Sequence, residues 1–103
     1  MRSLQELRRD YRAAFLRYLP RHDEAPLHVG YEIGRAAVVG SLSILDLVQI
    51  HHEVLLEVLR DTSGDDLTGV ATAASEFLVE VLATYDMTQR SLPRGPERPE
   101  TSG

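Results

Sequence analysis

Apolar residues recur every three or four positions in four separate segments of the chain, which is the pattern of amphipathic α-helices. The spacing predicts helices over residues 3–19, 26–39, 43–60 and 67–90. Because the connections between these segments are short, the expected fold is all-α, an antiparallel four-helix bundle within residues 1–92. Residues 93–103 are Pro-rich and polar without periodicity, which predicts a disordered tail.

Residues at the predicted helix ends fit capping roles. Ser3 is followed three positions later by Glu6, the spacing of a capping box, and Ser43 with Asp46 offers an N-cap and an early acidic residue. Pro20 lacks a backbone N–H and is expected to close the first helix. These signals place the helix boundaries independently of the apolar periodicity.

The second predicted helix contains Gly30 and Gly34 and is followed by Gly40. A glycine within a helix costs up to about 1 kcal/mol of helix stability relative to alanine. That cost indicates a packing role, and the simplest role is the close approach of a neighbouring helix backbone.

Residues 41–60, SLSILDLVQIHHEVLLEVLR, form the most apolar segment. On a helical wheel their apolar arc is much wider than the usual stripe of roughly 100°. Such a helix must bury more than one side, either deep within its own chain or against a second chain. We interpret it as the central helix and the buried middle of a homodimer. The residues assigned to the core or the dimer interface are Leu45, Val48, His51, His52, Leu55, Phe77 and Tyr85.

The adjacent His51, His52 and Glu53 are the only dense cluster of potential metal ligands. Neighbouring helix residues point about 100° apart, whereas zinc-binding helices use i, i+4 spacing. We therefore predict no metal site, although folding would in principle allow His22 and His28 to complete one. His51 is predicted to be a neutral core residue that is hydrogen-bonded to a tyrosine. The candidate partners are Tyr11, Tyr18, Tyr31 and Tyr85.

Composition and motifs exclude several classes of function. The chain has no cysteine and a net charge of −5, which argues against thiolate metal sites and against nucleic-acid binding. It has neither a continuous apolar run of about 18 residues nor a signal-peptide pattern, so no membrane span is predicted and a cytoplasmic location is expected. Because no nucleophile motif or phosphate-binding loop is present, we predict neither catalysis nor a cofactor.

Val79, Ala83 and Met87 recur at i, i+4 and i+8 on the fourth predicted helix. They lie roughly opposite the Phe77 and Val81 stripe, which is assigned to the core. A second apolar face on a helix whose first face is buried indicates a surface for a partner protein.

Three stretches together resemble a known family: YEIGRAA at residues 31–37, SILDLVQIHHEVLLEVL at 43–59 and EFLVEVLATYDMTQR at 76–90. They are similar to the amino-terminal regulatory domain of RsbU, a PP2C-type phosphatase of bacterial stress signalling. The resemblance covers residues 4–92, essentially all of the predicted helices.

The resemblance implies a non-catalytic helical domain that dimerises and recruits a switch kinase of the RsbT type. In that family, docking of the kinase activates the attached phosphatase, which acts in a sigma-factor partner-switching pathway. Carried over by position, the kinase-contacting residues are His28, Val79 and Ala83, to which the apolar periodicity adds Met87. The aspartates that bind metals in a PP2C domain have no counterparts in this sequence.

Two alternatives remain open at this stage. A helical bundle that senses a small molecule would hold its ligand near His51 and the tyrosines, in a mid-bundle pocket with convergent polar groups. A purely structural dimerisation module would need only the wide apolar arc of residues 43–60.

Overall fold

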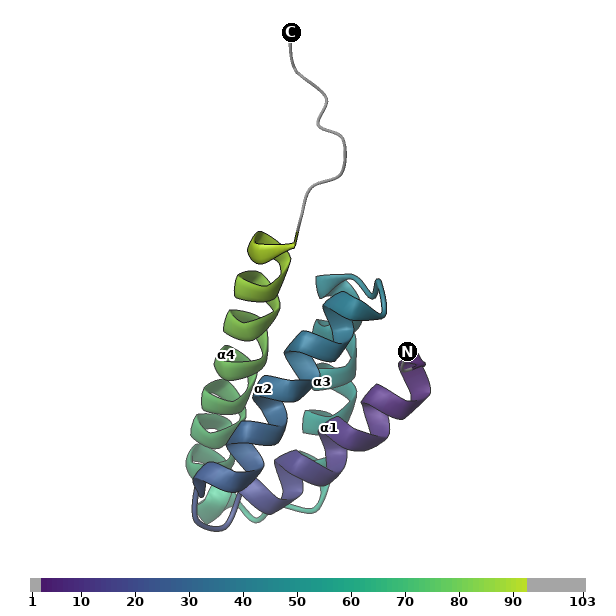
Figure 1. Ribbon diagram of the computed structural model, residues 1–103. Helices are drawn as coiled ribbons and strands as arrows, with labels where there is room; N and C mark the ends of the chain where they lie inside the picture. Colours follow the sequence, from purple (N-terminus) through teal and green to yellow (C-terminus); the bar gives the residue numbers. More distant parts are fainter. Residues whose placement is uncertain (1–2, 93–103) are drawn as a thin grey trace, which may run out of the picture.

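The structure is a computed structural model that describes residues 3–92, which form four α-helices. These are α1 (Leu4–Tyr18), α2 (Glu24–Val39), α3 (Ile44–Arg60) and α4 (Leu67–Ser91), with a 3-10 turn, η1 (Gly64–Asp66), leading into α4 (Figure 1). No strand occurs within these residues, so the predicted all-α four-helix bundle is confirmed. The predicted disordered tail, residues 93–103, lies outside the described residues.

Reciprocal hydrogen bonds fix the starts of α1 and α3. The Glu6 N–H donates to Ser3 Oγ at 3.1 Å, and the Ser3 N–H donates to Glu6 Oε1 at 3.0 Å. Ser43 and Asp46 repeat this arrangement at the same two distances. Both capping boxes satisfy backbone donors that the first helical turn leaves free.

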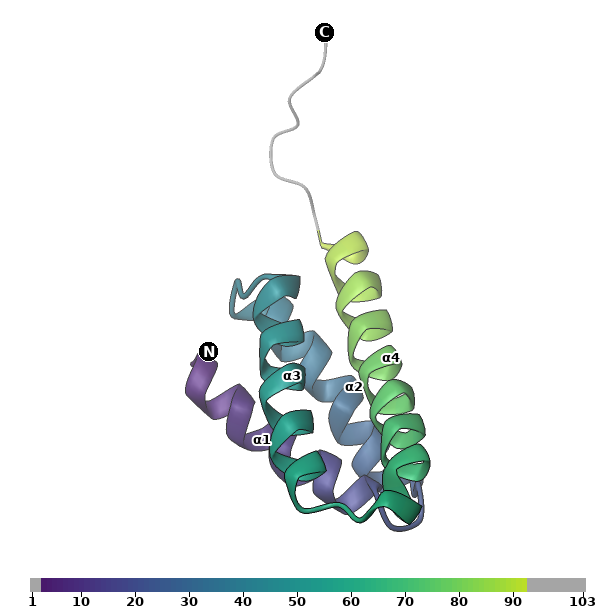
Figure 2. The ribbon, with the colours of Figure 1, turned by 180° about the vertical axis from the view of Figure 1, so that it is seen from behind.

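Consecutive helices run in opposite directions, but two of the neighbouring pairs in the bundle are parallel (Figures 1 and 2). α2 packs against α1 and α4, and α3 also packs against α1 and α4, so α2 and α3 lie across the bundle from each other. The ion pairs Arg8–Glu53 (2.7 Å) and Arg12–Glu57 (2.6 Å) advance together along α1 and α3, as parallel helices require.

The tightest helix contact joins α2 to α4 at two glycines. A Cβ on Gly30 would lie 3.2 Å from the Phe77 ring. A Cβ on Gly34 would collide with the Val81 carbonyl and would lie 2.9 Å from Thr84 Cβ. These contacts confirm the prediction that the glycines of the second helix allow the close approach of a neighbouring helix.

Aromatic side chains from α1 surround Phe77, which is fully buried on α4. The rings of Tyr11, Phe15 and Tyr18 lie 5.0, 5.8 and 5.8 Å from the Phe77 ring. The Tyr11 ring meets it edge-on at 86°, a favoured aromatic geometry. This cluster joins α1 to α4 through the centre of the bundle.

The prediction that residues 41–60 form the central helix requires correction for the single chain. α3 begins at Ile44, directly after its N-cap Ser43, and Ser41 turns the chain before it with a φ of 62°. Only Leu47, Ile50 and Val54 of α3 are buried, and the helix lies at one side of the bundle. Because apolar residues surround most of this helix, a helical wheel does not show which face is buried. The packing of α3 against the other helices determines that face, and the face is narrow.

We expect Gly34→Ala to destabilise the domain by about 1 to 3 kcal/mol, because the added methyl group meets the backbone of α4. Urea unfolding measures this change directly. The control is Gly69→Ala in α4, where an added Cβ meets nothing within 4 Å. That variant should be as stable as the parent or up to about 1 kcal/mol more stable. Equal stability of the two variants would contradict the assigned contact.

Candidate partner-binding surfaces

His51 is part of a hydrogen bond between α1 and α3. The hydroxyl of Tyr11 lies 2.8 Å from His51 Nδ1, and Tyr11 is fully buried. Burial, together with the neighbouring His52, lowers the pKa of His51. The imidazole is therefore neutral and shares one hydrogen bond with the Tyr11 hydroxyl through Nδ1, and burial also raises the pKa of Tyr11. Of the four candidate tyrosines, Tyr11 is the partner.

Aromatic rings occupy the space beside His51. The Tyr11 ring lies 6.0 Å from the imidazole and 5.0 Å from Phe77, which places three rings in succession across the bundle. Within residues 3–92, no group of three or more His, Asp or Glu side chains is placed to hold a metal ion.

The outer side of α4 exposes the three apolar residues that the sequence singled out. Val79 is 65% exposed and Met87 is 58% exposed, and Ala83 between them is also exposed. Since Phe77 and Val81 of the same helix are fully buried, α4 has one face in the core and a second apolar face outside it.

His28 on α2 contacts two residues of its own helix, one of which lies beside the second face of α4. Its imidazole stacks on the Tyr31 ring at 5.5 Å, and Nε2 lies 3.4 Å from Glu32 Oε2. Tyr31 and Met87 line one groove of about 430 Å³, with Arg35, Thr84, Thr88 and Ser91. Tyr31 thus connects His28 to the outer strip of α4. We call His28, Tyr31, Arg35, Val79, Ala83 and Met87 the α2–α4 surface.

Sequence reasoning missed two members of this surface, Tyr31 and Arg35. Arg35 follows His28 by seven positions, about two helical turns, so their shared polar face was the available signal. Among residues 3–92, Arg35 makes no ion pair. The groove therefore presents an uncompensated positive charge beside Met87.

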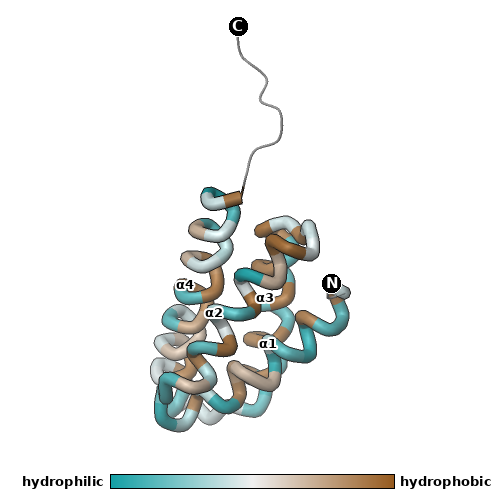
Figure 3. The backbone as a smooth tube through the Cα atoms, in the orientation of Figure 1, coloured by the Kyte–Doolittle hydropathy of each residue, from teal (hydrophilic) through white to brown (hydrophobic). Residues whose placement is uncertain are grey.

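A second exposed apolar region surrounds the start of α3. Leu45 is 73% exposed, Val39 61%, Ile44 43% and Val48 41%. Figure 3 shows apolar positions gathered where α2 ends and α3 begins. His52 is exposed farther along the helix, and Leu55 is half-buried. We call Val39, Ile44, Leu45 and Val48 the α3 surface.

By length and composition alone, Gly64–Ser91 is apolar enough to cross a membrane, with a mean hydropathy of 1.3 over its most apolar stretch. A core helix of a globular bundle meets the same criterion, and this segment supplies Phe77, Val81 and Tyr85 to the core. Only 28% of that stretch is buried inside the chain.

The fold and these surfaces define a small all-helical domain whose apolar residues exceed what its own core buries. The chain belongs to the family described as the N-terminal domain of the phosphoserine phosphatase RsbU, which matches residues 9–88. This is the regulatory domain of that phosphatase, distinct from the catalytic PP2C domain. No curated protein and no solved structure matches the chain significantly.

We expect acidification to destabilise the domain through His51. In the unfolded chain His51 has its ordinary pKa of 6.5, and in the folded chain a lower one. Between these two values the unfolded chain binds more protons. The stability that neutral His51 contributes is therefore complete above pH 6.5 and is lost as the pH falls through the folded pKa.

Urea unfolding at about pH 7.5 and about pH 5.5 measures this loss. His51→Gln, which keeps an acceptor for Tyr11 but does not titrate, should reduce the difference between the two conditions. His28→Gln, at an exposed histidine, serves as the control and should retain it. An unchanged difference in His51→Gln would contradict the assignment.

Proposed function

We propose that this regulatory domain forms a homodimer through the α3 surface and binds a switch kinase of the RsbT type through the α2–α4 surface. Binding of the kinase would regulate a PP2C-type phosphatase in a sigma-factor partner-switching pathway. The observation that carries the proposal is the exposure of large apolar side chains on two separate faces of a small bundle. Membership of the RsbU N-terminal domain family supports a regulatory role for these faces.

The α3 surface has the composition of a self-association site. Its four residues are aliphatic and uncharged, and three of them follow one another closely at the start of α3. Contiguous exposed aliphatic side chains on a small soluble domain mark interaction sites, because contact with water is unfavourable for them. A twofold dimer would bury the same patch on both chains.

The α2–α4 surface combines apolar contacts with a single positive charge. Val79, Ala83 and Met87 offer a strip along α4, and Arg35 lies at its edge. A partner that fits this arrangement presents an apolar ridge with a carboxylate positioned for Arg35. Such a charged rim contact favours correct orientation and fast association.

The two proposed surfaces meet α4 from different sides. The groove that contains Met87 lies on the α2 side of α4, whereas α3 packs against α4 from another side. A dimer formed through the start of α3 would leave the apolar strip of α4 uncovered on each chain. This geometry supports a regulatory domain that is dimeric before and after its partner binds.

We expect Val79→Asp to weaken binding of a purified RsbT-type kinase about tenfold or more, because a carboxylate replaces an apolar contact. Isothermal titration calorimetry measures the affinity, and circular dichroism checks helicity. The matched control is Ala71→Asp, which adds the same charge at another exposed position of α4. Equal affinities for the two variants would exclude this part of α4 from the interface.

We expect the chain to sediment as a dimer at micromolar concentration, and Leu45→Asp to shift it to a folded monomer. Leu45 is 73% exposed in the single chain, so the substitution should not disturb the core. The Val79→Asp variant should remain dimeric, because Val79 belongs to the α2–α4 surface and not to the proposed dimer interface. A parent chain that is folded and strictly monomeric would contradict the proposed dimer.

A further inference from the structure

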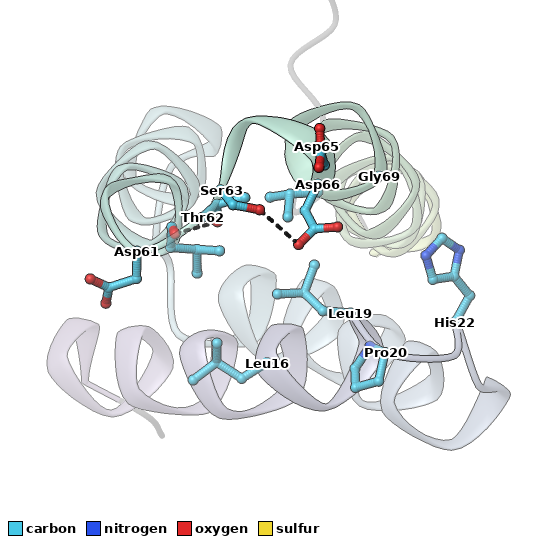
Figure 4. Close-up of a pocket in the computed structure, with 12 residues that line it drawn as sticks. Leu16, Leu19, Pro20, His22, Asp61, Thr62, Ser63, Asp65, Asp66 and Gly69 are labelled. Atoms are coloured by element: carbon cyan, nitrogen blue, oxygen red, sulfur yellow. Dashed lines mark hydrogen bonds between the residues drawn. The ribbon is translucent and has the colours of Figure 1, made fainter.

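A groove of about 640 Å³ lies at the end of the bundle where α4 begins. It separates the last turns of α1 from the connection between α3 and α4 (Figure 4). Its apolar lining consists of Leu16, Leu19, Pro20, Val58 and Val70, and its rim carries Asp61, Asp65 and Asp66. We call this site the end groove. It is separate from the α3 surface and from the α2–α4 surface.

Hydrogen bonds hold one wall of the end groove in place. After α1, His22 adopts a left-handed φ of 54° and stacks on Tyr18 at 4.9 Å. His22 Nδ1 and the Tyr18 hydroxyl lie 3.0 and 2.8 Å from Glu76 Oε1 on α4. Burial and then Glu76 raise the pKa of Tyr18 to about 12, so its hydroxyl remains a donor.

The connection between α3 and α4 holds the opposite wall. The Thr62 hydroxyl donates to the Val58 carbonyl oxygen at 2.6 Å, and the Ser63 hydroxyl donates to Asp66 Oδ2 at 3.2 Å. With both walls bonded internally, the groove exists before any partner arrives. Preformed sites avoid the entropy of ordering a loop on binding.

The rim of the end groove carries negative charges that no ion pair within residues 3–92 neutralises. None of its three aspartates makes an ion pair with another described residue, and no arginine lines the groove. Figure 4 shows Asp61 and Asp65 pointing outward from the rim, while Asp66 points toward Leu19. An apolar floor with negative charge around it is complementary to an aliphatic side chain flanked by positive charges.

We propose that the end groove binds a basic amphipathic segment of another protein. The segment would place an aliphatic side chain on Leu16 and Leu19 and a Lys or Arg beside Asp61 and Asp65. A dedicated basic segment fits better than a second copy of this chain, because three of the arginines on and just after α1 are already paired within the chain. Arg8, Arg12 and Arg21 lie 2.7, 2.6 and 3.5 Å from Glu53, Glu57 and Asp23.

The end groove allows an additional partner to bind together with the two already proposed. α3 starts at the opposite end of the bundle, and Met87 lies near the far end of α4 (Figure 1). A protein in the end groove would therefore leave both other surfaces accessible. The inference does not depend on the proposed dimer or kinase contact.

The test uses a synthetic helical peptide with Leu at every third or fourth position and Lys elsewhere, titrated into the isotope-labelled chain. We expect amide shifts at Leu16, Thr62, Ser63 and Val70, and affinity that falls as salt is raised. Leu16→Ser should weaken binding about tenfold. The matched control is Leu4→Ser, which lies on the same helix with similar exposure and should bind as the parent does.

Two further peptides separate the contribution of the positive charges from that of the aliphatic side chains. The same peptide with Glu in place of Lys should not bind, and the same peptide with Ser in place of Leu should bind at least about tenfold more weakly. Equal binding of either peptide, or shifts confined to α4 residues 79–87, would overturn the proposal. Dilution-dependent shifts at the groove without peptide would assign it to a second copy and overturn the proposal as well.

Discussion

The contact between α2 and α4 is the constraint on which the other features of the domain depend. Because Gly34 has no side chain, the α2 backbone lies directly against the backbone of α4 near Val81 and Thr84. This contact fixes the rotation of α4 about its axis. Phe77 then points into the aromatic side chains of α1, while Val79 and Met87 point to solvent. The candidate partner surface is therefore a consequence of how closely two helices pack.

Tyrosine hydroxyls add directional restraints to this apolar core. Tyr11 bonds to His51 on α3, Tyr18 to Glu76 on α4, and Tyr85 donates to the Leu42 carbonyl oxygen at 2.8 Å. A buried tyrosine contributes apolar contact area, but its hydroxyl requires a partner, so each bond favours one placement of the segments it joins. The histidine in the third helix is therefore a structural partner of Tyr11 that joins α3 to α1.

A bundle this small has more apolar residues than interior positions. The excess is concentrated on the start of α3 and on the outer strip of α4, while the end groove adds an apolar floor with an acidic rim. These three regions differ in charge: the α3 surface is neutral, the α2–α4 surface carries Arg35, and the end groove carries three aspartates. Different charges at separate sites suit a regulatory domain that distinguishes its partners by chemistry.

The sequence by itself determined the four helices, their capping boxes and the outward strip of α4, because these depend on interactions between residues a few positions apart. It also indicated a tyrosine partner for His51, because a buried imidazole needs one. The tertiary structure alone decided that Tyr11 is this partner, that Leu47, Ile50 and Val54 form the buried face of α3, and that Tyr31 and Arg35 lie beside Met87. Those choices depend on which helices become neighbours, and an apolar arc that surrounds most of a helix does not encode its own orientation.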